Sequence, residues 1–202
     1  MTLSRTHTLL VSTLALACAG TLATPATARG AAHAATPATT RSAADKAAIA
    51  ATRPQEMIVA ADIPAARRAA LLAPVDAFYG FWQNGSAQLL REAIGPDFID
   101  HTLPAGRPQG PAGPAAASAA FLKAVPDLKV TVVQRLVVAD RVVSHLRFTG
   151  HFTGTFGTRR GQGEPVDFIA TDIVRVRHGK ITDNWHLEDN LTFLQQIGAV
   201  AR

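Results

Sequence analysis

An aspartate interrupts an otherwise apolar row in the segment "VDFIATDIVRVR" (166–177). Successive side chains of a strand point to opposite faces, so Asp172 shares its face with Phe168, Ala170, Val174 and Val176. Burial raises the pKa of a carboxyl group toward neutral pH, where proton transfer is efficient. Arg175 and Arg177 fall on the opposite face. We therefore expect Asp172 to be a general acid or base; the alternative is a structural carboxylate paired with an arginine or a backbone amide.

His101 is the second candidate catalytic residue. It follows the segment "DFID" in a stretch rich in proline and glycine, which predicts a loop. A loop histidine beside a cavity can relay a proton or hydrogen-bond a substrate carbonyl. The same position is equally compatible with an exposed histidine, or with one that caps a turn together with Asp100.

Two aromatic residues, Tyr79 and Trp82, lie on one stripe of a predicted helix. We expect both to contact a substrate at the mouth of a cavity, with Tyr79, the only tyrosine, donating a hydrogen bond to an oxyanion. An aromatic stripe at helical spacing is also typical of packing between a helix and a sheet, and this alternative stays open.

The last predicted strand carries three further candidate substrate contacts, Asn184, Trp185 and His186. Asn184 and His186 share a face with Thr182 and Glu188, and Trp185 shares the other with Ile181, Asp183 and Leu187. One of the two faces must meet the cavity, and the pattern does not show which. A β-bulge would change the assignment.

Several kinds of site are disfavoured. The candidate metal ligands have neither the i, i+4 helical spacing of a zincin nor a cysteine framework, so we expect no metal. The segment "GTRRGQGEP" (157–165) lacks the Gly-Lys-Ser/Thr ending of a phosphate loop, and no Gly-x-Ser-x-Gly nucleophile elbow is present. The basic residues behind the net charge of +5 are scattered, which argues against nucleic-acid binding.

The N-terminal segment predicts export. Arg5, an apolar run over 9–22 and the small-residue motif "ATA" at 26–28 form the pattern of a secretory signal peptide over residues 1–28, and the run is too short for a membrane span. The only cysteine, Cys18, lies within it. Residues 29–62 are rich in alanine and threonine and predict a flexible linker, with a loose helix over 42–52 as the alternative. The folded domain is expected over 63–202.

The domain pattern predicts helices first and strands afterwards. We expect a helix over 63–85 that breaks at Pro74, with its main part starting there, and helices over 86–95 and 115–125 separated by a loop. Strands over 128–139, 142–156, 166–177 and 180–189 and a short final helix follow. This order predicts an α+β fold, in which a curved antiparallel sheet wraps on the N-terminal helices to form a cone with an internal cavity.

Four motifs occur in this order: "FYGFWQNG", "IGPDFIDHTLP", "FLKAVPDLKVTVVQRLVVADRVVSHLRFTGHFTGTF" and "VDFIATDIVRVRHGKITDNWHLED". Together they resemble the SnoaL-like polyketide cyclase, or ester cyclase, family of the nuclear-transport-factor-like cone superfamily, over roughly residues 74–198. The resemblance implies a cofactor-free intramolecular aldol cyclisation, an aspartate acid/base at Asp172 and a homodimer. The sequence departs from the family where Phe152 replaces its usual histidine, with a histidine one residue earlier at His151, and where Asn184 precedes Trp185.

These observations lead to three hypotheses. The first is an exported, cofactor-free acid/base enzyme that cyclises, isomerises or dehydrates a small apolar carbonyl compound. The second is an exported protein that binds a hydrophobic small molecule without turnover. The third is an accessory dimerisation module, which an exposed apolar face on the strand over 142–152 would support.

Overall fold

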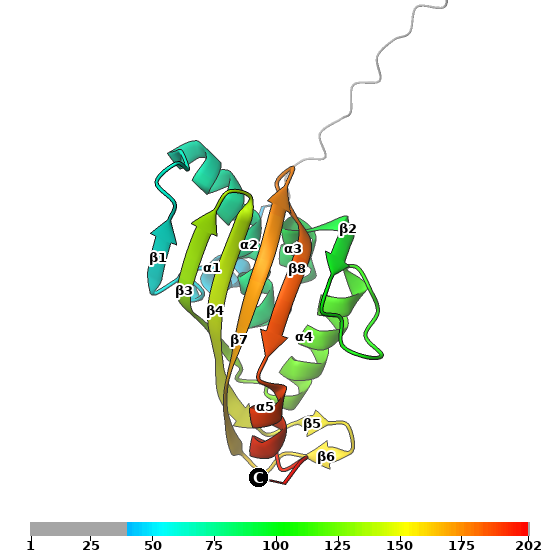
Figure 1. Cartoon of the computed structure of the whole chain (residues 1–202). Coiled ribbons are helices and arrows are strands. Elements are labelled where there is room, and N and C mark those ends of the chain that lie inside the picture. Colours follow the sequence, from blue (N-terminus) through cyan, green and yellow to red (C-terminus); the bar gives the residue numbers. More distant parts are fainter. Residues whose placement is uncertain (1–39, 202) are drawn as a thin grey trace, which may run out of the picture. The chain divides into compact units, whose positions relative to one another are not determined.

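One curved six-stranded sheet forms the framework of the computed structural model, which describes residues 40–201 (Figure 1). The strand order is β1-β3-β4-β7-β8-β2. The four central strands pair antiparallel, whereas the two edge strands pair in parallel with β3 and β8. The strands of this sheet are β1 (Glu56–Val59), β2 (Ile94–Asp100), β3 (Lys129–Val138), β4 (Arg141–Phe152), β7 (Glu164–Arg177) and β8 (Lys180–Glu188).

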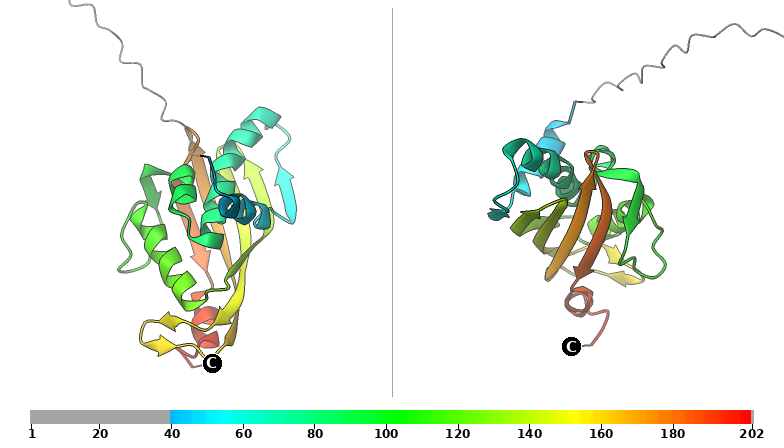
Figure 2. Two further views of the ribbon diagram at one scale, coloured as in Figure 1. Left: turned by 180° about the vertical axis from the view of Figure 1, so that it is seen from behind. Right: turned by 45° about the horizontal axis from the view of Figure 1, so that its top comes forward.

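The long helices cover one face of this sheet, as the two views of Figure 2 show. A short hairpin of two strands and the last helix close the end of the domain at which β4 and β7 project beyond the sheet (Figure 1). The helices are α1 (Ala43–Ala51), α2 (Ala65–Asn84), α3 (Ala87–Ala93), α4 (Ala112–Ala124) and α5 (Asn190–Gln196), and the hairpin consists of β5 (Thr155–Phe156) and β6 (Arg159–Arg160). The predicted α+β fold is thus confirmed, with the refinement that both edge strands are parallel to their neighbours.

The core lies between α2 and the inward rows of the strands. On α2, Leu71, Val75 and Phe78 are buried at helical spacing, and Phe168 and Val174 of β7 are buried at strand spacing. Burying each such side chain stabilises the fold by about 1.5–3 kcal/mol. The buried residues of the helix and of the strands therefore pack into one core. Their positions show which face of each strand points inward.

The pairing of β7 with β8 begins at a two-residue turn. His178 and Gly179 have φ values of 50° and 73°, the left-handed pair that a two-residue hairpin turn needs. His178 and Gly179 therefore form the turn between the two strands that were predicted over 166–177 and 180–189. From this turn the pairs Arg177–Lys180 and Val176–Ile181 form first, and a one-residue register shift after them places Asp172 opposite His186 rather than Trp185.

The prediction of a flexible linker over 29–62 is wrong for the part that the structure describes, and the alternative of a helix over 42–52 is confirmed by α1. Ser42 caps α1 by accepting a hydrogen bond from the Asp45 backbone N–H at 3.0 Å, and β1 pairs with β3. A Cβ on Gly80 would stand 2.8 Å from Cγ1 of Ile49, so glycine lets α1 approach α2 closely. Ala48 of α1 is buried, so this helix packs on the domain through one face. The predicted signal peptide lies outside the described residues.

Two element boundaries also differ from the prediction. Pro74 lies buried within the continuous helix α2 and does not start a new one, because the apolar stripe around it stays packed despite the lost backbone hydrogen bond. Residues 94–100, predicted partly as loop, form β2, where Pro96 is tolerated on an edge strand. No helix within residues 40–201 is long and apolar enough to cross a membrane.

Candidate active site

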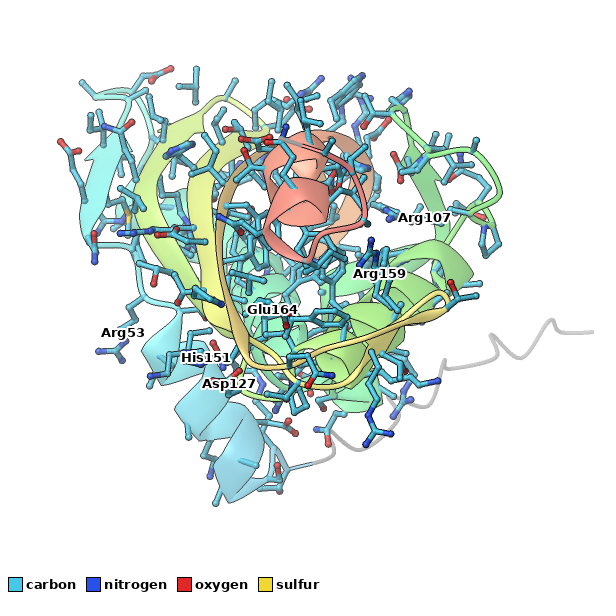
Figure 3. The ribbon with its side chains drawn as sticks, turned by 90° about the horizontal axis from the view of Figure 1, so that it is seen from below. Arg53, Arg107, Asp127, His151, Arg159 and Glu164 are labelled. Atoms are coloured by element: carbon cyan, nitrogen blue, oxygen red, sulfur yellow. The ribbon has the colours of Figure 1, made fainter. Side chains whose placement is uncertain are left out.

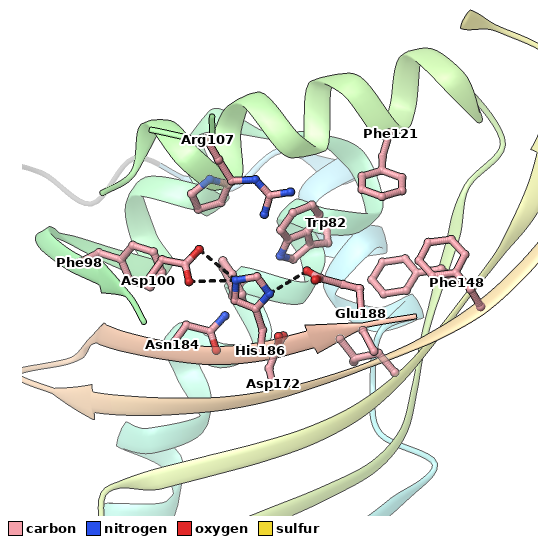
Figure 4. Close-up of a pocket in the computed structure, with 15 residues that line it drawn as sticks. Trp82, Phe98, Asp100, Arg107, Phe121, Phe148, Asp172, Asn184, His186 and Glu188 are labelled. Atoms are coloured by element: carbon pink, nitrogen blue, oxygen red, sulfur yellow. Dashed lines mark hydrogen bonds and ion pairs between the residues drawn. The ribbon is translucent and has the colours of Figure 1, made fainter. Parts of the chain in front are cut away.

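A pocket opens between the inner face of the sheet and helices α2 and α4 (Figure 4). Its walls are mostly apolar and aromatic, and five ionisable groups and one amide converge in it. The space inside it is about 610 Å³, which includes space open to solvent. It is lined by Phe78, Trp82, Phe98, Asp100, Arg107, Pro114, Phe121, Leu146, Phe148, Phe168, Ala170, Asp172, Asn184, His186 and Glu188.

Asp172 is the carboxylate that the sequence placed on an apolar row, and the structure places it in the pocket wall, 6% exposed. Burial raises the pKa of Asp172 to about 6, against the opposing charge of His186 and with a further contribution from Glu188. No arginine pairs with Asp172 among the described residues, and Arg175 lies on the opposite face as predicted. Asp172 therefore has a pKa suited to proton transfer near neutral pH.

Tyr79 is fully buried and lies behind Asp172 rather than on the pocket surface. Its hydroxyl donates a hydrogen bond to Oδ2 of Asp172 at 3.1 Å. Burial, and then the charge of Asp172, raise the pKa of Tyr79 well above its ordinary value, so the phenol stays a donor. The guanidinium carbon of the buried Arg135 lies 5.3 Å from the Tyr79 ring centroid. The predicted contact of Tyr79 with substrate is thus replaced by a role in holding Asp172.

Strand β8 presents Asn184, His186 and Glu188 to the pocket, which answers the question that the pattern left open. The register shifts between the pairs Arg175–Asp183 and Val176–Ile181, so Thr182 is an extra residue on β8. This bulge lets Ile181 and Asn184 both face inward, although they are three residues apart. Asn184 and His186, which were predicted to contact the substrate, therefore line the pocket.

His186 is held between two carboxylates (Figure 4). Its Nε2 lies 2.9 Å from both carboxylate oxygens of Asp100, and its Nδ1 lies 2.8 Å from Oε1 of Glu188. Burial alone would lower the pKa of His186, but hydrogen bonds to and charges on Glu188 and Asp100 outweigh it and raise the pKa to about 9. The imidazole is therefore a cation at neutral pH, directly opposite Asp172 in the sheet.

Two predicted site residues lie outside the pocket, on the other face of β8. The rings of His101 and Trp185 stack at 4.3 Å with an interplanar angle of 3°. His101 Nε2 lies 2.9 Å from Asp183 Oδ1, and the guanidinium carbons of Arg141 and Arg175 lie 5.4 and 5.3 Å from the Trp185 ring centroid. The prediction that His101 and Trp185 meet the substrate is therefore not supported, because the bulge turns Trp185 outward and His101 follows it.

Trp82 is half-buried and lines the pocket as predicted. The position of the missing family histidine is occupied by the buried Phe152, 1% exposed, whereas His151 points to solvent. Figure 3 shows His151 beside Asp127, with its Nδ1 2.8 Å from Asp127 Oδ2, on the opposite side of the molecule from Arg107. The one-residue shift therefore removes this histidine from the pocket.

Sequence reasoning missed three ionisable pocket residues, Asp100, Glu188 and Arg107. A signal existed for Glu188, because it follows Asn184 and His186 at strand spacing. Asp100 was placed in a loop, and its approach to His186 depends on the parallel pairing of Asp100 with Asn184, which no local pattern encodes. Arg107 lies in the loop between β2 and α4, where the sequence gives no positional signal.

Comparisons with known proteins agree with this fold. Residues 74–197 match the family model described as SnoaL-like polyketide cyclase. Among solved structures, a protein from Bacillus cereus ATCC 10987 named as a candidate polyketide cyclase is 37% identical, with a TM-score of 0.68, and the match covers 74% of this chain and 95% of that one.

More distant matches have the same fold. IdmH of Streptomyces antibioticus, named as a candidate polyketide cyclase, is 27% identical over 62% of this chain and 96% of its own, with a TM-score of 0.55. A candidate SnoaL-like polyketide cyclase from Jannaschia sp. CCS1 is 26% identical over 70% and 97%, with a TM-score of 0.56. A search of curated proteins found no match. The chain belongs to the SnoaL-like polyketide cyclase family.

Proposed function

We propose that the protein is a cofactor-free enzyme that cyclises, isomerises or dehydrates a small, largely apolar carbonyl compound by general acid/base catalysis. One observation carries this proposal: a buried carboxylate with a pKa of about 6, Asp172, lines a mostly apolar pocket without an arginine partner. Membership of the SnoaL-like polyketide cyclase family supports a reaction of this class.

Asp172 removes a proton from the carbon next to the substrate carbonyl in this scheme. Tyr79 orients the carboxylate by holding Oδ2, and Asn184 hydrogen-bonds the same group. Negative charge then develops on the carbonyl oxygen. The His186 cation, fixed by Asp100 and Glu188, stabilises that charge electrostatically in a mostly apolar pocket. Asp172 returns the proton when the new bond is complete.

The apolar end of the pocket binds the hydrocarbon part of the substrate. The rings of Phe148 and Phe168 stack with centroids 5.1 Å apart, and Phe121 stacks on Phe168 at 5.8 Å. These flat ring faces favour an aromatic or alicyclic ligand, because ring pairs gain about 0.5–1.5 kcal/mol beyond their buried area.

The test is proton exchange, which needs no knowledge of the natural product. Incubation of neutral aryl ketones such as 1-tetralone in D₂O, followed by ¹H NMR, measures deuterium uptake at the carbon next to the carbonyl. We expect Asp172→Asn to reduce the exchange rate at least about 100-fold. The control is Asp167→Asn, an exposed aspartate on the same strand, which should leave the rate unchanged. Equal rates in the two variants would remove the catalytic proposal.

A non-catalytic binding protein is the second candidate, and the stacked phenylalanine wall favours it. Such a protein would bind an aryl ketone with equal affinity as wild type and as Asp172→Asn, without exchange in either. Calorimetry on the same two proteins measures this, so one set of samples separates the two functions.

We further propose export of the mature domain, supported by the signal-peptide pattern at residues 1–28. N-terminal sequencing of the protein recovered outside the cytoplasm of its host should begin at Arg29. A full-length chain retained inside the cells would contradict this proposal.

A homodimer through the outer face of the sheet is also proposed. The outward row of β4 (the strand over 142–152) carries Arg147 and His151 and offers no large apolar face. Ile169, Ile173 and Leu187 on β7 and β8 are instead 47%, 40% and 77% exposed. Analytical ultracentrifugation should show a dimer that Leu187→Lys dissociates, and a monomeric wild-type chain would refute it.

A further inference from the structure

Arg107 differs from the other unpaired arginines of the described chain. Within residues 40–201, the side chain of Arg107 makes no ion pair and no hydrogen bond, and the residue is half-buried. The other arginines in this range without an ion pair are exposed to solvent; they are Arg53, Arg67, Arg68, Arg91, Arg159 and Arg160. A guanidinium that loses part of its hydration without gaining a carboxylate is poorly compensated in the free protein. A ligand can supply the missing partner.

The surroundings of Arg107 aim it into the pocket. It lies in the loop between β2 and α4, and its side chain lines the pocket. Figure 4 shows the guanidinium across the pocket from the row formed by Asp100, His186 and Glu188. A ligand that contacts this row on one side can therefore contact Arg107 on the other side.

Trp82 adds a second donor on the same side of the pocket. Its indole is half-buried and lines the cavity, and its N–H has no hydrogen-bond partner within residues 40–201. Buried or half-buried indole N–H groups usually find an acceptor. Two unsatisfied donors thus face a pocket whose three carboxylates already have partners from the protein.

Building on the proposed function, we propose that the substrate carries one carboxylate and that Arg107 binds this carboxylate, with the Trp82 N–H as the auxiliary donor. The guanidinium fork matches a carboxylate with two parallel hydrogen bonds. A doubly charged phosphate fits less well, because Asp100 and Glu188 line the same pocket and repel a second negative charge. The substrate class is therefore an oxo acid with an aromatic or alicyclic body.

This carboxylate lies away from the reacting carbonyl. Burial raises the pKa of Glu188, but the hydrogen bond and charge of His186, and then the charge of Arg107, lower it overall. The main influences on Asp172 come instead from His186, Glu188, Tyr79 and Asn184. The charge of Arg107 thus acts on Glu188 and is not among the main influences on the base. It recognises the substrate and does not take part in proton transfer.

The experiment compares 4-oxo-4-phenylbutanoate with its methyl ester, two probes that differ only in charge at one end. Calorimetry on the Asp172→Asn protein measures binding separately from catalysis. We expect the acid to bind about 10-fold to 100-fold more tightly than the ester, the magnitude of a charge-assisted hydrogen bond. Arg107→Gln should abolish this preference, and Arg107→Lys should retain part of it, since the charge stays while the fork is lost.

Arg91→Gln, the same change on an exposed arginine of α3, is the matched control and should leave the preference intact. Equal affinity for acid and ester, or a preference that survives in Arg107→Gln, would overturn the inference. Neither result bears on the proposed function, because that function is tested separately by measuring deuterium uptake at the carbon next to the ketone. Conversely, a preference for the acid without exchange in the wild-type chain would support the carboxylate site and refute catalysis.

Discussion

Two histidine–aspartate pairs flank the same strand, β8, one on each face. His186 meets Asp100 on the inner face and His101 meets Asp183 on the outer face, both at 2.9 Å. The side chains of the inner pair are each 6% exposed, whereas those of the outer pair are 33% and 10% exposed. Similar partners at equal distance thus sit in different dielectric surroundings.

Burial decides what each pair can do. Exposed pairs gain little, because water and salt screen them and ordering the side chains costs entropy. A buried pair interacts more strongly, but removal of one partner leaves an uncompensated charge. On this basis the inner pair belongs to the site, since it fixes a cation beside Asp172, and the outer pair belongs to the surface cluster around Trp185.

The first prediction compares His186→Gln with His101→Gln. The inner replacement leaves Asp100 and Glu188 without their shared cation and should lower the free energy of unfolding at pH 7 by about 3–5 kcal/mol. The outer replacement should cost less than about 1 kcal/mol. Urea denaturation followed by circular dichroism measures both. Equal losses would show that the two faces of β8 do not differ as we describe.

The second prediction concerns pH. The pKa of His186 is raised from 6.5 to about 9, so the folded protein keeps a proton that the unfolded chain releases between these values. The stabilising contribution is therefore complete below pH 6.5 and is lost as the pH rises to 9. The free energy of unfolding should fall by about 3 kcal/mol across this window. His101→Gln should keep this pH dependence and His186→Gln should lose it. If His101→Gln lost it instead, the outer pair and not the inner pair would cause the loss of stability at high pH.

The inner row of β7 was predictable from sequence, because strand alternation alone places Asp172 among apolar neighbours. Tyr79 was predictable as a core aromatic of α2, but its contact with Asp172 spans 93 positions in the chain and no periodicity reports it. The fold class followed from the order of helical and strand patterns. The parallel edge strands β1 and β2 did not, since each pairs with a segment far away in sequence.

The orientation of β8 shows most clearly what could not be predicted from the sequence. A strict two-residue alternation groups Ile181 with Trp185, yet the extra residue Thr182 puts Ile181 in the core and Trp185 outside. A bulge is a property of the pairing between two strands, so one strand's sequence does not encode it. His101 was misplaced for the same reason, because its stacking partner turned outward.

The third prediction tests how the inner face holds its base. Tyr79→Phe removes the hydroxyl that donates to Asp172 Oδ2 and lowers the pKa of Asp172. The pKa of Asp172 should therefore rise further above 6, and the acid limb of the pH–rate profile for deuterium exchange should move to higher pH, by the equivalent of about 1 kcal/mol. A lower rate with an unmoved profile would indicate a structural role for Tyr79 only.

The fourth prediction has the smallest energetic effect and uses the two tryptophans of the chain, one for each face. Trp185→Leu removes the outer stack and its contacts with Arg141 and Arg175, and should cost about 1 kcal/mol or less, because the cluster is solvated. The fluorescence that remains then comes from Trp82 in the pocket. Binding of 4-oxo-4-phenylbutanoate should quench it, whereas Trp82→Leu should leave a signal from Trp185 that does not respond. A response from Trp185 alone would place the ligand on the outer face and exchange the roles of the two histidine pairs.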